Sequence, residues 1–303
     1  MNNQLYTIKT ISSLHCGIGS GQGDIDLPVA KSPVTGLPHI PSSSLKGVVK
    51  DWFFNRSDIA QNSHAQLEEL FGPENSDFAS AVSFGDGTLL ALPVRSYFGG
   101  FAYLSSPLVL GLLRQVLLRS GLKEIPKIPE FGAHTQEQHY KASIPENSLL
   151  EGGGIQDKVL LEEIDLLIEP SYQGLTQEWA ELIGKIYFSD EEYRRVFHQR
   201  FIIADDNVLQ FMAQTALPVD AHIAIDDKTG VVHKGALWYE ESVPPETLFY
   251  GVIGVDNGNG EAKSTEKELT QLLLDDSPTT IQIGGKATTG KGMVDFRFPS
   301  INE

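Results

Sequence analysis

A glycine-rich stretch near the N-terminus, GIGSGQGDIDLPV at residues 17–29, limits what this chain can fold into more than any other feature. Neither a helix nor a strand tolerates so many glycines, because each one loses much conformational freedom on folding. Residues 6–15 before it alternate β-branched and other side chains and predict a strand. Residues 42–54 after it place apolar side chains at helical spacing, with Ser42 or Ser43 as the cap. The chain therefore begins with a strand, a long loop and a helix.

Further along, strand patterns and helix patterns interleave without a regular period. A buried helix opens at Pro107, residues 158–169 predict one strand, and residues 221–241 predict a hairpin whose turn is Asp-Lys-Thr-Gly. Residues from about 123 to 155 are rich in Pro, Gly, His and Gln and predict an insertion with little regular structure. This order favours a single α+β domain with antiparallel pairing and insertions.

Composition limits the compartment and the kinds of site. Cys16 is the only cysteine, so the chain can form no internal disulfide and no zinc site built on several thiolates. No apolar run approaches the roughly 18 residues that span a bilayer, and the N-terminus lacks the apolar stretch of a signal peptide. We expect a cytoplasmic protein without a membrane partner.

The formal net charge of −17 argues against indiscriminate binding of nucleic acid, which depends on clustered Lys and Arg. The charge is uneven, however, because the first 50 residues carry four lysines and only two acidic residues, Asp24 and Asp26. Much of the acid lies between Glu146 and Asp206, in a pattern typical of a solvated outer face. An acidic shell around a small basic groove remains compatible with RNA binding.

The segment GGKATTGKG, residues 284–292, nearly matches a phosphate-binding P-loop. Gly285, Gly290 and Lys291 have the required spacing, but Gly292 stands where a Ser or Thr should meet magnesium, and a strand follows in place of a helix. A nucleotide-hydrolysing enzyme is therefore disfavoured. The same loop can present backbone N–H groups and lysines to a sugar-phosphate chain, and a flexible hairpin turn is the alternative.

Other possible motifs lack the residues or the spacing that their chemistry requires. The stretch GIGSGQGD satisfies neither the dinucleotide-binding pattern nor the nucleophile elbow, and His134 and His139 lack the spacing of a zinc site, which makes surface histidines the preferred interpretation. Asp24 and Asp26 lie on a loop near lysines, where either an active site or ordinary turn chemistry is possible. The run LWYEE, residues 237–241, is equally compatible with an ordinary strand end.

Five blocks, in order along nearly the whole chain, resemble one family. They are LHCGIGSGQGDIDLPV, TGLPHIPSSSLKGVV, DGTLLALPVRSYFGGFAYLSSP, GALWYEESVPPETLFY and IQIGGKATTGKG. They are similar to the backbone subunits of type III-B (Cmr) CRISPR effector complexes, in the RAMP superfamily. The resemblance implies a ferredoxin-like, or RRM-like, palm with inserted finger and thumb segments, the hairpin from about residue 220 to 241 being the thumb.

The resemblance also implies roles for particular residues. The family's catalytic aspartate falls on Asp26, His15 matches a position at the start of the loop, and Tyr239 and Glu241 are weaker catalytic candidates, whereas Asp24 does not match. The residues that correspond to RNA contacts are Ser43, Ser44, Lys46, Lys50, Gly284, Gly285, Lys286, Gly290, Lys291 and Gly292. The high acidity and the cysteine at position 16 depart from what the family leads us to expect.

By this resemblance the chain is an antiviral endoribonuclease subunit, with one cleavage site per copy. Its implied partners are a CRISPR guide RNA, a target RNA, copies of itself in a filament and the other subunits of the Cmr complex. Its implied cofactor is a divalent metal, Mg²⁺, with Asp26 acting either as the base or as the metal ligand. The alternative is a RAMP backbone subunit that binds guide RNA and leaves the cutting to another protein.

Overall fold

The computed structural model describes residues 2–19, 21, 24–75, 77–132, 140–152, 157–162, 164–225, 232–275 and 280–299. The helices are α1 (Ser42–Asn55), α2 (Ser57–Phe71), α3 (Pro107–Arg119), α4 (Gln173–Tyr187), α5 (Glu191–His198), α6 (Asp206–Thr215) and α7 (Glu266–Asp275), with short 3₁₀ turns η1 (Pro170–Tyr172) and η2 (Ala287–Thr289). The strands are β1 (Asn2–Thr10), β2 (His39–Ile40), β3 (Val82–Phe84), β4 (Gly87–Arg95), β5 (Phe101–Ser105), β6 (Lys141–Ser143), β7 (Lys158–Leu161), β8 (Ile164–Ile168), β9 (Phe201–Ala204), β10 (Val219–Ile225), β11 (Val232–Glu241), β12 (Leu248–Val255), β13 (Thr280–Gln282) and β14 (Met293–Arg297).

Most strands join in one mixed sheet in the order β13-β14-β1-β12-β4-β5-β9-β6-β8-β7, with β2 paired to β4 and β3 to β12. Near its centre, β1 pairs antiparallel with both β12 and β14. Tyr6 lies opposite Gly251 in this pairing, and its hydroxyl donates to the carbonyl of Gly85 at 2.8 Å. The tyrosine ring passes over a strand position where only a glycine leaves room.

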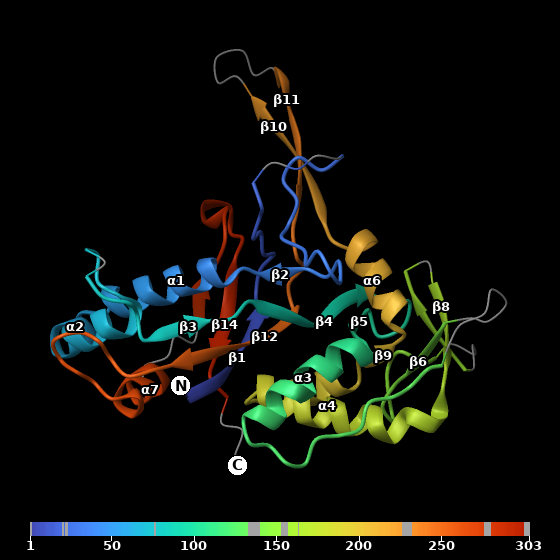
Figure 1. The fold of residues 1–303 in the computed structure, drawn as a ribbon. Helices are drawn as coiled ribbons and strands as arrows, with labels where there is room; N and C mark the ends of the chain where they lie inside the picture. The colour runs from blue at the N-terminus through green and yellow to red at the C-terminus, as the bar shows by residue number, and fades with distance from the viewer. Residues whose placement is uncertain are drawn as a thin grey trace.

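Helices cover the sheet and bury its apolar side chains. In the view of Figure 1, α3 and α4 lie below the sheet, and α1 lies above it. The apolar face of α1 buries Leu45, Val49 and Phe53, as the helical spacing predicts. On α4, Trp179 is fully buried, and its indole N–H donates to the carbonyl of Lys127 at 2.9 Å.

Strands β10 and β11 form a separate antiparallel hairpin that projects away from the sheet (Figure 1). Its foot is tied to the chain's first loop, because Leu27 forms a parallel bridge with Glu240 and Leu14 forms an antiparallel bridge with Val243. The expected turn, residues 227–230, lies outside the described residues. The hairpin therefore meets the glycine-rich loop at the point where the hairpin leaves the body of the protein.

The α+β prediction is confirmed, and so are the first helix, the helix opened by Pro107 and the strands on either side of residues 284–292. The prediction of one strand over residues 158–169 is wrong. The chain turns back at Glu162, whose φ is +45°, so that β7 and β8 pair antiparallel. Helices α2 and α5 were not predicted, and α5 lies in the acidic region read as a solvated surface, with Phe197 buried.

The insertion over about residues 123–155 stays a prediction. Residues 133–139, which include His134 and His139, and residues 153–156 lie outside the described part, and the remainder contains the short strand β6. Within the part of the chain that the structure describes, no helix is both long enough and apolar enough to cross a membrane.

Gly251→Ala is expected to lower the free energy of unfolding by about 1–3 kcal/mol, because the added methyl group would run into the Tyr6 ring. The control is Gly47→Ala on the exposed face of α1, where a Cβ meets no atom within 4 Å. That change should raise stability by about 0.5–1 kcal/mol through helix propensity. Urea denaturation of both variants measures the difference, and equal effects would contradict the packing argument.

Candidate active site

The two ends of the glycine-rich loop, residues 17–29, are paired with each other. Gly17 forms an antiparallel bridge with Val29, and the N–H of Ala30 donates to the carbonyl of Cys16 at 2.8 Å. Between these points the N–H of Gly21 donates to the Asp26 carbonyl, also at 2.8 Å. The loop is closed on itself at its base, and Asp24 and Asp26 lie on its exposed part.

Asp26 has an exposed side chain that is nevertheless held in place. Its Oδ2 accepts a 2.8 Å hydrogen bond from the backbone N–H of Tyr239 on β11. The next residue, Leu27, donates its N–H to the Tyr239 carbonyl at 3.0 Å. One carboxylate oxygen is thereby fixed against the hairpin, and Oδ1 has no hydrogen-bond partner among the described residues. An ionised carboxylate in this position can accept a proton or bind a cation.

Asp24 differs from Asp26 although it lies only two residues away. Its side chain is exposed, and no described residue donates a hydrogen bond to it. The two aspartates therefore form a natural pair for comparison, one oriented by β11 and one not.

His15 is nearly buried, with 7% of its surface exposed. Its Nδ1 lies 2.7 Å from the carbonyl oxygen of Glu241, and since a carbonyl only accepts, Nδ1 must carry a proton. Nε2 is then the ring atom that can take up a proton. A Cβ at Gly17 would lie 2.7 Å from Nε2, so that glycine leaves space for the ring.

Tyr239 and Glu241 lie two residues apart on β11 and differ in exposure. The Tyr239 side chain is 41% exposed, and its backbone contacts the Asp26 segment. The Glu241 side chain is buried, with Oε1 2.7 Å from the ammonium of Lys31 and Oε2 accepting from the N–H of Val29 at 3.1 Å. Both candidates contact the loop, Tyr239 through its backbone and Glu241 through its carboxylate.

The lysines of the second glycine-rich loop pair with carboxylates of the hairpin. Lys291 lies 2.8 Å from Oε1 of Glu240 and 2.9 Å from Oδ2 of Asp220, and Lys286 lies 3.2 Å from Oε2 of Glu240. Burial alone would raise the pKa of Glu240, but hydrogen bonds and charge from Lys291 and Lys286 outweigh it and hold that pKa below its usual range. Burial alone would lower the pKa of Lys291, yet its two carboxylate partners raise it.

The backbone of this second loop approaches the first closely. The N–H of Gly285 donates to the His15 carbonyl at 2.9 Å, and Gly284, with φ +76°, has no room for a side chain beside that carbonyl. Gly290 and Gly292 also have positive φ, and residues 284–290 are exposed. The loop is thus exposed beside the candidate active site, although several of its backbone N–H groups, among them those of Gly285 and Gly292, already donate within the protein.

The predicted contacts on α1 have partners within the protein. Lys46 donates to the Ser80 hydroxyl, and burial followed by the charge of Lys50 lowers the pKa of Lys46. Lys50 donates to the Gly72 carbonyl at 2.8 Å. Ser43, by contrast, is exposed in the first turn of α1, and Ser44 is partly exposed beside it. The RNA-binding roles of these residues stay predictions.

Cys16, which departs from the resemblance, is a free buried thiol. Burial raises its pKa to about 12, so the sulfur is protonated at neutral pH. This residue packs beside His15 and the second loop without contributing a nucleophile.

Sequence reasoning missed three residues of this arrangement: Glu240, Asp220 and Lys31. Alternation along a strand would have indicated that Glu240 faces away from Tyr239 and Glu241, toward a different partner. Asp220 lies directly opposite Glu240, an arrangement of like charges that normally destabilises a hairpin unless a cation intervenes. Lys291 supplies that cation. For Lys31 no signal in the sequence indicated its partner.

A metal at this site would depend on few protein ligands. Among the described residues, no three His, Cys, Asp or Glu side chains gather as a metal site would require. Asp26 offers one exposed carboxylate oxygen in a fixed orientation, and the exposed Asp24 lies two residues away. Magnesium often binds in this way, through one or two carboxylates together with phosphates of the substrate and water. The residues present therefore fit an ion held jointly with RNA.

Glu240→Gln is expected to lower the free energy of unfolding at pH 7 by about 3 kcal/mol. This value is the lower end of the range for a broken buried ion pair, because Lys291 still has Asp220 as a partner. Pairing lowers the folded-state pKa of Glu240 below the unfolded value of about 4.3. Its contribution is therefore complete above that pH and is lost as the pH falls through the folded-state pKa. Urea denaturation at pH 7, 5 and 3.5 measures the free energy of unfolding of the variant and the wild type. The difference between the two should be smallest at pH 3.5.

The control is Glu178→Gln on the exposed face of α4, which removes one charge without breaking a buried pair. It should change stability by less than about 0.5 kcal/mol. A wild-type to Glu240→Gln difference that stays constant from pH 7 to 3.5 would contradict the assigned titration.

Comparison with known proteins places this arrangement in a family. A sequence model described as the RAMP superfamily matches residues 7–295. A curated relative from Pyrococcus furiosus, named CRISPR system Cmr endoribonuclease Cmr4, is 30% identical over 309 residues, which cover 99% of this chain and 97% of that protein. The resemblance seen in the sequence is thereby confirmed.

Solved structures share the fold. A crystal structure of oligomeric Cmr4 from Pyrococcus furiosus has a TM-score of 0.72 at 25% identity and covers 100% of each chain. A cryo-EM structure of the type III-B Cmr-β complex bound to cognate target RNA contains a chain with a TM-score of 0.72 at 23% identity, covering 98% of this chain and 97% of that one. The predicted ferredoxin-like palm is confirmed by these likenesses.

Proposed function

Because the chain belongs to the RAMP superfamily, we propose that it is the backbone subunit of a type III-B CRISPR effector complex and cleaves target RNA at one site per copy. The observation that carries the proposal is Asp26, an exposed carboxylate on a glycine-rich loop, oriented by the N–H of Tyr239. A loop aspartate with a role only in turn formation needs no such partner from a distant strand.

The named relatives support the same assignment. A relative that aligns over 99% of this chain is named an endoribonuclease, and a structural neighbour that matches over the whole of both chains is described as oligomeric. The partners of this chain are then guide RNA, target RNA, further copies of itself and the other Cmr subunits, and its compartment is the cytoplasm. The guide would lie along α1 and the loop over residues 284–292, with the target presented to Asp26.

The chemistry that a single carboxylate supports is attack by the RNA on itself. The 2′-hydroxyl of one nucleotide gives its proton to Asp26, the 2′-oxygen bonds to the adjacent phosphorus, and the bond from phosphorus to the 5′-oxygen breaks. The departing 5′-oxygen takes up a proton from water, or from His15 Nε2 once that atom has itself been protonated. The products are a 2′,3′-cyclic phosphate and a 5′-hydroxyl.

Geometry matters as much as the base, because the 2′-oxygen must stand in line with the bond that breaks. The projecting hairpin is suited to displacing a nucleotide from a guide–target duplex, since its foot is bonded to the same loop that carries Asp26. A divalent ion, Mg²⁺, held by Asp26 and RNA phosphates would stabilise the charge that develops on the phosphate.

Asp26→Asn should slow target cleavage in the assembled complex by about 10²- to 10⁴-fold, the usual contribution of a positioned base. Guide binding and target capture should persist, because the amide keeps the side chain's size and can still accept from the Tyr239 N–H. The control is Asp24→Asn, which removes the same charge from the unanchored position and should cleave normally. Single-turnover cleavage of a guide-matched RNA, with and without magnesium, measures both. Full activity in Asp26→Asn would favour a backbone subunit that only binds guide RNA.

Lys286→Ala should weaken guide binding without altering sequence preference, since a lysine that contacts phosphate does not read bases. Lys286 is chosen because its side chain is 38% exposed, whereas that of Lys291 is 12% exposed and held by two carboxylates. The slope of log affinity against log salt should fall by about 0.7.

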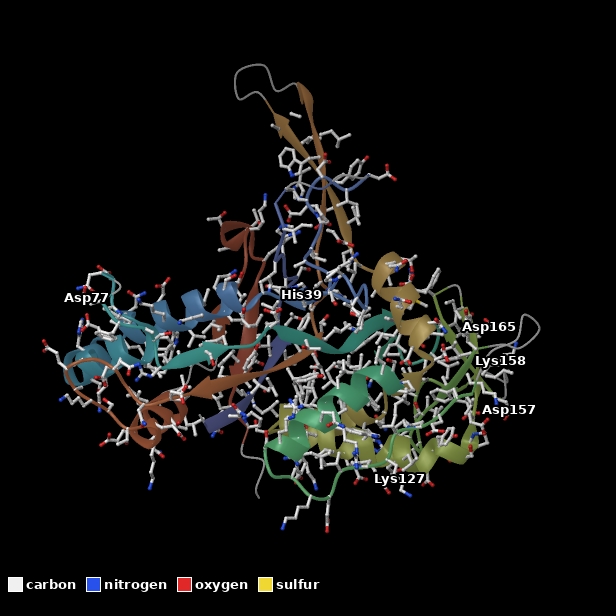
Figure 2. All side chains as sticks on the ribbon, viewed as in Figure 1. His39, Asp77, Lys127, Asp157, Lys158 and Asp165 are labelled. Atoms are coloured by element: carbon white, nitrogen blue, oxygen red, sulfur yellow. The ribbon has the colours of Figure 1, made fainter. Side chains whose placement is uncertain are left out.

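The control is Lys158→Ala, because Lys158 pairs with Asp165 and both lie at the right-hand edge of the molecule (Figure 2), whereas β14, which follows the second loop, lies left of the centre (Figure 1). Its salt slope should equal that of the wild type. Equal salt slopes for Lys286→Ala and Lys158→Ala would show that the loop over residues 284–292 does not contact the guide RNA.

A further inference from the structure

The strongest candidate for an unassigned role is the buried pair of Glu241 and Lys31, which lies directly behind the proposed catalytic loop. Glu241 contacts that loop at three points: its N–H donates to the Leu27 carbonyl at 3.0 Å, its Oε2 accepts from Val29 N–H at 3.1 Å and its Oε1 meets the Lys31 ammonium at 2.7 Å. Its carbonyl oxygen also accepts from His15 Nδ1 at 2.7 Å. One residue thus binds both chain segments that carry the proposed catalytic groups.

The burial of this carboxylate argues against direct catalysis. The Glu241 side chain is only 2% exposed, and both of its oxygens already have donors. A general base must reach the proton that it abstracts, and the exposed Asp26 can do so where Glu241 cannot. Any effect of Glu241 on cleavage must therefore pass through the loop.

The loop needs such support because its sequence supplies little of its own. Two contacts at Tyr239 hold Asp26 and Leu27, and backbone pairing with Gly17 and Cys16 holds Val29 and Ala30. The Glu241 carboxylate adds the side-chain bonds that join this segment to β11, at Val29 and Lys31. Without its charge, the Lys31 ammonium loses its partner and the segment that follows Asp26 is freer to shift.

We propose that the Glu241–Lys31 ion pair is a positioning pair that fixes the Asp26 carboxylate for cleavage, an inference that rests on the proposed ribonuclease function. Neither residue touches the RNA. Displacing a reacting group by about 1 Å can cost on the order of 100-fold in rate without changing the affinity for substrate. The pair should therefore act on the rate of the chemical step and leave guide and target binding unchanged.

The test measures single-turnover cleavage at saturating target in the assembled complex for Glu241→Gln, Lys31→Met, the double variant and Lys31→Arg. Each of the first two should cleave about 10- to 100-fold more slowly, and the double variant no more slowly than the slower single one, because the two residues act as a unit. Lys31→Arg keeps the cation and should restore most of the rate. The shape of the pH–rate profile should match the wild type in every variant.

The matched control is Lys9→Met, which breaks a partly buried ion pair with Glu246 at 3.2 Å, apart from the catalytic loop. It should lose stability to thermal unfolding without losing cleavage. If Glu241→Gln fails to assemble, the comparison of Lys31→Met with Lys31→Arg decides, since Lys31 is 27% exposed and tolerates change better.

Wild-type rates in both single variants would overturn the proposal, and so would a loss confined to target affinity. A loss in Glu241→Gln with a changed pH profile and normal cleavage in Lys31→Met would make Glu241 catalytic in its own right. Asp26→Asn in the same assay separates the two hypotheses: if it cleaves normally, the proposed active site fails, whereas if it alone is inactive, only the positioning role fails.

Discussion

Two consecutive buried carboxylates at the foot of the hairpin, Glu240 and Glu241, hold the candidate site together. Side chains alternate along a strand, so Glu240 faces the second glycine-rich loop and Glu241 faces the first. A buried carboxylate is costly unless it is paired and hydrogen-bonded, and each of these has cationic partners from the loop that it faces. Strand β11 therefore binds both loops, which links the projecting hairpin to Asp26 and to the proposed RNA-binding loop.

This arrangement explains how so acidic a chain remains compatible with RNA binding. The two lysines of the second glycine-rich loop are already neutralised within the protein: Lys291 by two carboxylates and Lys286 by one. A site of this kind has little non-specific attraction for a polyanion. Uncharged contacts, such as those from Ser43 and Ser44 in the first turn of α1, then gain importance, because they position a sugar-phosphate chain without adding net charge. RNA binding would depend on shape and on the neighbouring subunits more than on bulk charge.

Sequence reasoning reached the α+β class, the first helix and the hairpin, because each depends on local signals: periodicity and turn residues. Asp26 was singled out through the family resemblance, and its catalytic role stays a prediction. Sequence reasoning failed where the deciding contact is distant in sequence. The reversal at Glu162 depends on a positive φ that a non-glycine residue rarely adopts, so residues 158–169 read as continuous. The partners of Glu241, 210 and 212 residues away at Lys31 and Val29, are likewise invisible to any local pattern.

The loop that carries Asp26 is rich in glycine, yet it must hold a carboxylate in a defined position. A loop free of side chains lets RNA and backbone approach each other closely, but it has no packing of its own to fix a carboxylate. The contacts that fix the loop come instead from the neighbouring strand β11. The Tyr239 N–H donates to Asp26, the Glu241 carbonyl accepts from His15, and the Glu241 carboxylate accepts from Val29 in the segment after Asp26. The loop that would cut is thus bonded to two residues at the foot of the hairpin, Tyr239 and Glu241, so a shift of the hairpin foot must move the proposed base with it.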